Sequence, residues 1–282
     1  MAWQSTNDFM GEYTNISWCD STVNPTSGCD GCELFNPSKP DDATCYAKGI
    51  HESRLALSLP KLYAPRFNEV RLIPGRMKKA FGWRDLSGTE RKGKPHLNDK
   101  PRFIFVGDMA DIFSKAVPFE FLREEVFFPM RTEKGARHFY IVLTKRPQRM
   151  AEFSKWLGVW PNNCIAMTSI TDQKSADARI PHLMNVEAKL LGISAEPLHE
   201  HLVIPLFQNS HSTEFHDKIK WLVCGGESGA RRKDCGVEAI EFVARQGANA
   251  GVPTFVKQDS AFRDGERGRI SEEIWKLKQV PI

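Results

Sequence analysis

The chain contains no run of eighteen apolar residues, so we expect no helix that crosses a membrane and no membrane partner. Its first residues lack the basic stretch and the following apolar stretch of a secretory signal. Internal repeats and low-complexity segments are also missing. These absences make the cytoplasm the expected location.

Neither basic nor acidic residues are in large excess. The 39 lysines and arginines nearly balance the 35 aspartates and glutamates, which leaves a net charge of +4. A charge this small excludes no class of partner. The length of 282 residues and the 41% hydrophobic content suffice for a sizeable core, in one large α/β domain or two small ones.

Seven cysteines are present, an odd number that speaks against a disulfide framework in a cytoplasmic chain. Cys164 and Cys224 lie in apolar runs and are expected to be buried small residues. Cys29, Cys32 and Cys45 instead share a loop punctuated by glycine and proline. No other part of the sequence offers a comparable set of soft metal ligands.

Short β-branched runs alternate with helix-like stretches along the chain. The eight runs are residues 15–23, 68–73, 102–107, 138–143, 164–168, 189–194, 220–224 and 253–256. The helix candidates between them are residues 119–132, 147–157, 175–185 and 237–250. Strands that alternate with helices form parallel βαβ units, and eight units predict an α/β fold of the (β/α)8 TIM-barrel type. An open or partial barrel is the main alternative.

We expect a single barrel domain over residues 1–282, with surface insertions near residues 86–100 and 208–217. Six of the runs end in polar or charged residues, where the chain leaves the sheet. These residues include Asp108, Asp111, Lys145, Arg146, Ser169, Glu196, Glu227, Lys257 and Gln258. The carboxyl ends of barrel strands form the rim where ligands bind. Polar loops explain any one of these positions, but the whole set favours a ligand site.

Three interpretations of the cysteine loop remain open on the residues alone. Three thiolates can hold a [4Fe–4S] cluster with one iron left open. A structural zinc site needs a fourth ligand, for which His51 is the nearby candidate. Inert thiols are the third. Gly28 and Gly31 permit a tight backbone around sulfur, and Cys45 precedes a predicted helix, residues 46–57, whose N-terminus stabilises a thiolate.

A set of short motifs extends from about residue 16 to residue 258. The motifs are Trp18-Cys19-Asp20, Asn24-Pro25, Gly28-Cys29, Cys45-Tyr46-Ala47, FVGDMADIF at 105–113, LTKRP at 143–147, AEPL at 195–198, GGESG at 225–229 and Lys257-Gln258. Together they resemble the phage Gp37/Gp68 family, also called the DUF5131 family. That family is similar to radical S-adenosylmethionine (SAM) enzymes, in which three cysteines follow the first strand of a barrel.

The resemblance implies that Cys29, Cys32 and Cys45 bind the irons of a [4Fe–4S] cluster and that SAM binds the open iron. An external donor would supply one electron, and the resulting 5′-deoxyadenosyl radical would abstract a hydrogen from the substrate. The cofactors then carry out the demanding chemistry, and the barrel orients the reactants and excludes water.

The same resemblance assigns roles to the rim. The catalytic set is Lys145, Glu196 and Lys257. The cofactor-binding set is Tyr46, Asp108, Ser169, Glu196, Gly225, Gly226 and Glu227. The substrate set is Asp111, Arg146 and Gln258.

A bacteriophage-type family and basic rim loops suggest a nucleic acid or nucleotide as substrate, in a DNA modification or repair reaction. The sequence carries no recognisable nucleic-acid-binding motif, and a small phosphorylated metabolite fits equally well. The alternative is a zinc-stabilised nucleic-acid-binding protein without catalysis. A metal-dependent hydrolase ranks last, because no strand end carries a His-x-His pair.

Overall fold

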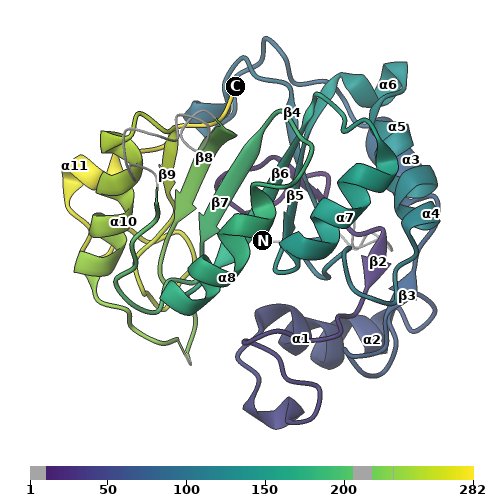
Figure 1. Cartoon of the computed structure of the whole chain (residues 1–282), viewed down its shortest axis with the longest axis horizontal. Helices are drawn as coiled ribbons and strands as arrows, with labels where there is room; N and C mark the ends of the chain where they lie inside the picture. Colours follow the sequence, from purple (N-terminus) through teal and green to yellow (C-terminus); the bar gives the residue numbers. More distant parts are fainter. Residues whose placement is uncertain (1–10, 206–217, 231) are drawn as a thin grey trace.

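The computed structural model describes residues 11–205, 218–230 and 232–282, and the insertion expected near residues 208–217 lies outside them. The main feature is a seven-stranded sheet that curls into a half-barrel (Figure 1). In spatial order its strands are β1 (Ser21–Val23), β4 (Arg102–Val106), β5 (His138–Thr144), β6 (Cys164–Ile170), β7 (Leu191–Ala195), β8 (Ile219–Cys224) and β9 (Thr254–Val256). All neighbouring pairs are parallel. Since β1 and β9 are the two ends of this order, the partial-barrel alternative is confirmed.

Helices cover the convex face of the sheet and match the predicted stretches within two residues. They are α7 (Pro147–Leu157), α8 (Gln173–Leu183) and α10 (Val237–Asn249). Another helical stretch comprises α4 (Phe119–Phe121), a π-helical turn (Leu122–Phe127) and α5 (Phe128–Met130). The shorter elements are α3 (Arg76–Phe81), α6 (Glu133–Ala136), α11 (Glu272–Trp275) and the 3-10 turns Pro40–Asp42 and Pro95–Leu97. Along the described residues, no helix is both long and apolar enough to span a bilayer.

The sheet separates two apolar layers, because successive strand residues point to opposite faces. In β4, Ile104 and Val106 pack outward among the helices, whereas Phe103 and Phe105 point into the barrel. There the ring of Trp18 lies 4.9 Å from that of Phe105. Aromatic and aliphatic side chains therefore fill the interior below the rim.

One predicted barrel strand is wrong. Of residues 68–73, only Arg71–Leu72 forms a strand, β3, which pairs antiparallel with β2 (Thr26–Ser27) outside the half-barrel. A barrel strand is buried on both faces, but this run carries two charged residues and leaves Leu72 39% exposed. The predicted first strand is also shorter, since residues 15–20 form a loop before β1.

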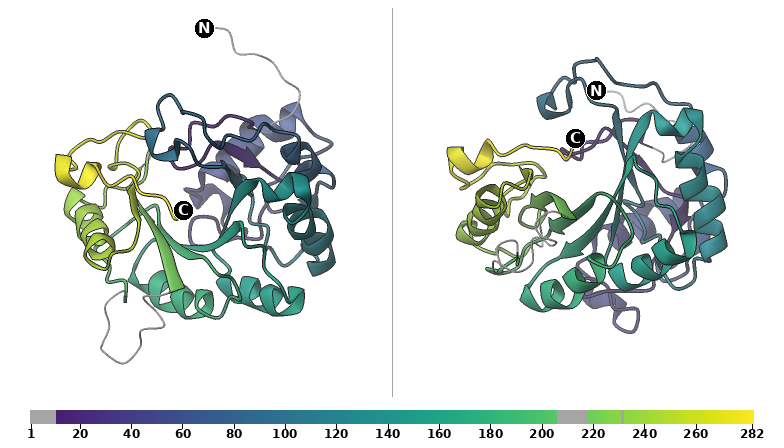
Figure 2. Two further views of the ribbon diagram at one scale, coloured as in Figure 1. Left: turned by 90° about the horizontal axis from the view of Figure 1, so that it is seen from above. Right: turned by 45° about the horizontal axis from the view of Figure 1, so that its top comes forward.

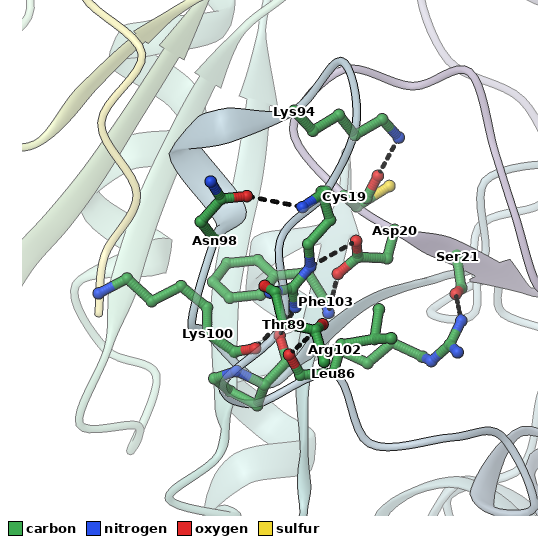
Figure 3. A network of polar contacts seen from close by, with 12 residues as sticks. Cys19, Asp20, Ser21, Leu86, Thr89, Lys94, Asn98, Lys100, Arg102 and Phe103 are labelled. Atoms are coloured by element: carbon green, nitrogen blue, oxygen red, sulfur yellow. Dashed lines mark hydrogen bonds and ion pairs between the residues drawn. The ribbon is translucent and has the colours of Figure 1, made fainter.

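Residues 86–100 lie at the open side of the half-barrel, beside the C-terminal segment (Figure 2). The Lys94 ammonium donates to the Cys19 carbonyl oxygen at 2.5 Å (Figure 3). It also donates to the carbonyl oxygens of Thr14 and Ile16 at 2.7 and 2.8 Å. Three backbone acceptors around one ammonium fix this segment to the chain that leads into β1. The expected surface insertion is therefore part of the barrel wall.

His96 continues this closure across the gap between the first and last strands. Its Nε2 lies 2.8 Å from the carbonyl oxygen of Ser17, which precedes β1. Its ring packs edge-on against Phe255 of β9, with the ring centroids 4.9 Å apart. One side chain thus contacts both sides of the gap, and we call residues 86–100 the closing segment.

Two arginines anchor the closing segment from within. The fully buried Arg102 donates to the Ser21 hydroxyl at 2.9 Å (Figure 3). It also donates to the Arg84 carbonyl oxygen at 2.9 Å. Arg91 forms an ion pair with Asp20 at 3.3 Å. Arg91 therefore ties the closing segment to the chain before β1, and Arg102 ties β1 and β4 to Arg84, just before that segment.

Candidate functional site

The cysteine loop lies at the carboxyl ends of the strands, where Gly28 bridges to Ala110 after β4. Gly28 and Gly31 have φ angles of 80° and 106°. A Cβ on Gly28 would lie 2.5 Å from the Glu69 carbonyl oxygen, and one on Gly31 would lie 2.6 Å from Pro37 Cδ. Only glycine fits both turns, in agreement with the tight loop predicted from the sequence.

Cys29, Cys32 and Cys45 come from different parts of this loop. Cys29 is buried and follows β2. Cys32 and Phe35 exchange backbone hydrogen bonds of 2.8 and 3.1 Å, which turn the chain back. Cys45 directly precedes α1 (Tyr46–Ile50). Two turns and a helix start therefore hold the three thiols.

Burial raises the pKa of all three thiols, and each pKa is raised further by another cysteine of the set. Arg146 acts in the opposite direction on Cys29, as Lys145 does on Cys32 and Cys45. Backbone N–H groups at the start of α1 also lower the pKa of Cys45. The neighbouring cations favour the thiolate form that binds metals.

A single metal ion and a cluster place different demands on three thiols. Within residues 11–205, 218–230 and 232–282, no three His, Cys, Asp or Glu side chains are placed to hold one metal ion. A tetrahedral zinc with bonds of about 2.3 Å requires sulfurs roughly 4 Å apart. A [4Fe–4S] cluster attaches each thiolate to a different iron and accepts a wider triangle. The described residues therefore show no preformed site for a single metal ion, and metal binding by the three thiols stays a prediction.

His51, the expected fourth zinc ligand, points away from such a role. It begins the π-helical turn His51–Leu55, which joins α1 to α2 (Ala56–Ser58). Its Nε2 lies 2.7 Å from the carbonyl oxygen of Ala64, and its ring packs edge-on against Tyr63 and Phe67. This histidine is a core residue, so the zinc interpretation lacks its fourth ligand.

Arg146 clamps the cysteine loop onto the barrel. Its guanidinium donates to the carboxylate of Asp111 at 2.7 Å and to the Gly31 carbonyl oxygen at 2.5 Å. It also lies 3.7 Å from Cys29 Sγ and pairs with Asp30. The residue assigned to the substrate thus contacts the predicted iron ligands themselves.

Asp111, also assigned to the substrate, is the fixed end of this clamp. Besides Arg146, its carboxylate accepts from the Thr144 hydroxyl at 2.7 Å and from the backbone N–H groups of Phe113 and Lys145 at 3.0 and 3.1 Å. Several donors on one buried carboxylate hold it in a single orientation. A substrate role for Asp111 stays a prediction.

The predicted catalytic residues lie along a connected path at the rim. Lys145 Nζ donates to Ser169 Oγ at 2.7 Å, and that hydroxyl donates to the Glu196 carbonyl oxygen at 2.8 Å. Lys257 Nζ lies 3.3 Å from Glu196 Oε1 and 3.8 Å from Asp264. Burial opposes the charge of Lys257, but the two carboxylates outweigh it and raise the pKa of this lysine. Lys257 therefore stays an ammonium at neutral pH.

Tyr46 and Asp108 lie between this path and the cysteines. The Tyr46 hydroxyl donates to the Asp108 carbonyl oxygen at 2.5 Å, while the Tyr46 side chain stays 60% exposed. Burial raises the pKa of Tyr46, and Asp108, Cys45 and Glu196 raise it further. The hydroxyl of Tyr46 is therefore fixed next to charged groups, while its ring stays open to solvent.

Burial also raises the pKa of Asp108 to about 6, despite hydrogen bonds from Asn24 and Thr22. The Asn24 amide donates to Asp108 Oδ1 at 2.6 Å, and its oxygen accepts from the Met109 N–H at 3.0 Å. Asn24 therefore orients the Asp108 carboxylate, whose pKa lies well above that of an ordinary aspartate.

Gly225 and Gly226 are needed by the chain itself. A Cβ on Gly226 would lie 2.3 Å from Ser260 Oγ, and one on Gly225 would lie 3.2 Å from the backbone of Gln258. The amide of Gln258 donates to the Gly226 carbonyl oxygen at 2.9 Å and accepts from the Gly265 N–H at 2.9 Å. Gln258, assigned to the substrate, thus has both ends of its amide in structural hydrogen bonds. Glycine contacts with a cofactor stay a prediction.

Glu227, the last residue assigned to the cofactor, lies at the edge of the rim. Its carboxylate accepts from the Lys233 N–H at 2.9 Å and lies 3.9 Å from His199 Nε2. Burial lowers the pKa of His199, so this histidine is neutral at pH 7. His199 therefore does not offset the charge of Glu227.

Sequence reasoning missed several residues of the site. Asn24 and Asp30 stand in or beside the quoted motifs, and their positions could have suggested a supporting role. Glu33 binds Arg179 of α8 through contacts of 2.5 and 3.0 Å, which ties the cysteine loop to a second helix. Asp264 lies in a polar segment of the sequence that gives no sign of its proximity to Lys257.

Comparison with known proteins gives one family. The family described as "Protein of unknown function (DUF5131)" matches residues 13–276. No curated protein and no solved structure matches the chain significantly. The match covers most of the chain, so the protein belongs to the DUF5131 family.

Proposed function

We propose that this DUF5131 protein is a radical-SAM-like enzyme whose Cys29, Cys32 and Cys45 hold a [4Fe–4S] cluster. The observation that carries the proposal is that one glycine-constrained loop presents three thiols at the carboxyl ends of the half-barrel strands. When bound, the cluster and SAM would supply one-electron radical chemistry.

The residues around the cysteines prepare and position the iron ligands. Arg146 holds the loop through the Gly31 carbonyl oxygen and offsets negative charge at Cys29. Lys145 offsets negative charge at Cys32 and Cys45. Fixed cations favour thiolates without having to move when the metal binds.

The rest of the rim suits SAM. The open ring of Tyr46 offers a face for the flat adenine group. Asp108, Glu196 and Glu227 are acceptors for the SAM ammonium or ribose hydroxyls, and Ser169 is positioned to orient the ligand.

Lys257 is suited to hold a carboxylate or a proton. The carboxylates of Glu196 and Asp264 keep it charged, and Cys19 lies close enough to add to that effect. Its position at the rim would let it bind the SAM carboxylate or an acidic substrate group. Lys145, which donates to Ser169, supplies a second ammonium on the far side of Glu196.

A basic groove beside the cysteine loop supports a nucleic-acid or nucleotide substrate. Its volume is about 850 Å³, and its lining residues are Lys115, Lys145, Arg146, Pro147, Gln148, Arg149, Glu152, Ala178, Arg179 and His182. Glu152 is the one acidic residue of this lining. Lysine and arginine around such a groove attract phosphate groups.

The deciding experiment is anaerobic reconstitution with iron and sulfide, followed by analysis of metal, sulfide and the visible spectrum. We expect about four irons and four sulfides per chain in the wild type. The variant Cys29→Ala/Cys32→Ala/Cys45→Ala should retain none. Cys235→Ala is the matched control, because Cys235 is a free thiol outside the loop.

Reduction of the reconstituted protein with an external electron donor and SAM should then release 5′-deoxyadenosine. One bound zinc and no iron after reconstitution would contradict the radical mechanism. That result would favour the zinc-stabilised nucleic-acid-binding protein instead.

A further inference from the structure

A pocket of about 540 Å³ opens at the side of the half-barrel, away from the cysteines. Its walls come from the closing segment, the edge strand β9 and the C-terminal segment. Its lining residues are Ser17, Gly93, Pro95, His96, Phe255, Lys257, Gly265, Trp275, Lys276 and Lys278. Pockets of 300 to 1,000 Å³ are the usual size for small ligands. We call it the side pocket.

The side pocket combines cations with rings. Lys257, Lys276 and Lys278 line it together with Trp275 and His96, and the lining contains no carboxylate. Lys257 and Lys276 already have acidic partners elsewhere, at the rim and on the exposed face of α11. Of these three lysines, Lys278 is therefore the one that has no acidic partner among the described residues.

Lys278 is held over aromatic faces instead of beside an acid. Its ammonium lies 3.2 Å from the centroid of Trp275 and 5.0 Å from that of Phe255, and it donates to the Val256 carbonyl oxygen. Within the part of the chain that the structure describes, no carboxylate lies within ion-pair distance of it. An ammonium with one backbone acceptor keeps N–H groups for an anionic ligand.

The backbone fixes this arrangement. Lys278 forms an antiparallel bridge with Phe255, and the Val256 N–H donates to the Leu277 carbonyl oxygen at 2.9 Å. The C-terminal segment is thus bridged to β9 at the edge of the sheet. The ammonium and the rings are presented on regular structure, which suits specific binding.

We propose that the side pocket binds a nucleoside monophosphate, with the phosphate on Lys278 and the base beside the ring of His96. The phosphate supplies the missing counter-ion, and a flat base matches an aromatic wall. The inference rests on the proposed function in one respect, namely that this nucleotide is the substrate. Lys257 lines the side pocket and also meets Glu196 at the rim, so a ligand there would lie next to the proposed SAM site.

The test is calorimetric titration of the full chain with AMP, adenosine and inorganic phosphate at pH 7. The variant Cys29→Ala/Cys32→Ala/Cys45→Ala is titrated alongside the wild type. We expect AMP to bind both proteins equally and at least about tenfold more tightly than adenosine or phosphate, because two contacts act together. Equal affinity for AMP and phosphate, or for AMP and adenosine, would overturn the nucleotide assignment.

Lys278→Gln should weaken AMP binding about tenfold and leave adenosine binding unchanged, while Lys278→Arg should retain AMP. Lys155→Gln, on an exposed turn of α7, is the control. Unchanged AMP affinity in Lys278→Gln would refute the assignment. Because binding is measured without iron, a failure of the cluster hypothesis leaves this result intact, and the reverse also holds.

The pH dependence gives a second measurement. Burial lowers the pKa of Lys278 to about 8, and Cys224 and Glu196 act against that effect. The neighbouring His96 has a lowered pKa and stays neutral above pH 7, and Lys257 stays charged. AMP affinity should therefore fall as the pH rises from 7 to 9 in the wild type and stay level in Lys278→Arg. A fall of equal size in both proteins would contradict a phosphate contact with Lys278.

Discussion

The closed side of the half-barrel and its rim both bury charged groups, but they satisfy them differently. On the closed side, Lys94 donates to three backbone carbonyl oxygens, and Arg102 donates to carbonyl and hydroxyl oxygens with no exposed surface. At the rim, the three thiols disfavour one another's ionisation and the ring of Tyr46 stays open. Saturated polar groups hold the fold together, whereas incompletely satisfied ones are available to a ligand.

Arg102→Met should have the largest effect on stability. The substitution leaves the carbonyl oxygen of Arg84 and the hydroxyl of Ser21 without their buried donor. We expect the free energy of unfolding in urea to fall by about 4 kcal/mol. Lys92→Met, at an exposed position of the closing segment, should change it by less than about 0.5 kcal/mol. Equal losses of unfolding free energy in the two variants would show that the buried hydrogen bonds of Arg102 do not hold the closed side together.

Arg146→Gln should separate assembly of the site from the stability of the fold. The variant loses the contacts with Asp111, Asp30 and Gly31, so the cysteine loop is no longer fixed. We expect iron retained after reconstitution to fall at least about tenfold, with a loss of about 2 kcal/mol in unfolding free energy. Arg123→Gln, a partly exposed arginine in the π-helical turn Leu122–Phe127, serves as control. Full iron retention in Arg146→Gln would show that the clamp is dispensable.

Asp108→Asn tests the rim through the pH dependence of stability. An unfolded aspartate titrates near pH 3.9, whereas the pKa of Asp108 in the folded protein is about 6. The folded state therefore binds the proton more tightly, and stability is lost as the pH rises from about 4 to 6, by up to about 3 kcal/mol. The amide that replaces the carboxyl group does not titrate, so urea unfolding across this range should show a smaller decline than the wild type or the exposed control Asp41→Asn. Parallel curves for all three proteins would contradict the raised pKa.

Tyr46→Leu should have the smallest effect, and it should change only the affinity for SAM. Loss of an aromatic face is worth about 1 kcal/mol, so SAM affinity should fall about fivefold to tenfold while iron content stays the same. Tyr46→Phe keeps the ring and should stay within about threefold of the wild type. The measurement is SAM titration of the reconstituted, unreduced protein. Equal SAM affinity in Tyr46→Leu and the wild type would show that the Tyr46 ring does not contribute to SAM binding.

Much of the fold was predictable because its signals are local. Pro147 at the first turn of α7 and the apolar strands on either side are readable within a dozen residues. The run at 68–73 was misassigned because a two-residue strand of a small sheet has the same composition as a short barrel strand. Partner choice depends on burial, which no local pattern contains.

The site was predictable only in part. The cysteines and the rim residues belong to recognisable motifs, but the contact between Arg146 and the cysteine loop joins residues more than a hundred positions apart. The role of Lys94 could not be read either, because its partners are carbonyl oxygens, which every residue carries. Asp264 approaches Lys257 only because the chain after Gln258 folds back over the rim.

The separation between the cysteine loop and its clamp has a consequence for biosynthesis. Cys29 and Arg146 are 117 residues apart, and a ribosome that adds about 5 to 20 residues per second needs roughly 6 to 23 seconds to span that interval. During this time the nascent chain carries the thiols without the guanidinium that later fixes them. Under the proposed function, delivery of iron and sulfide would be productive only after translation has passed β5 and the start of α7.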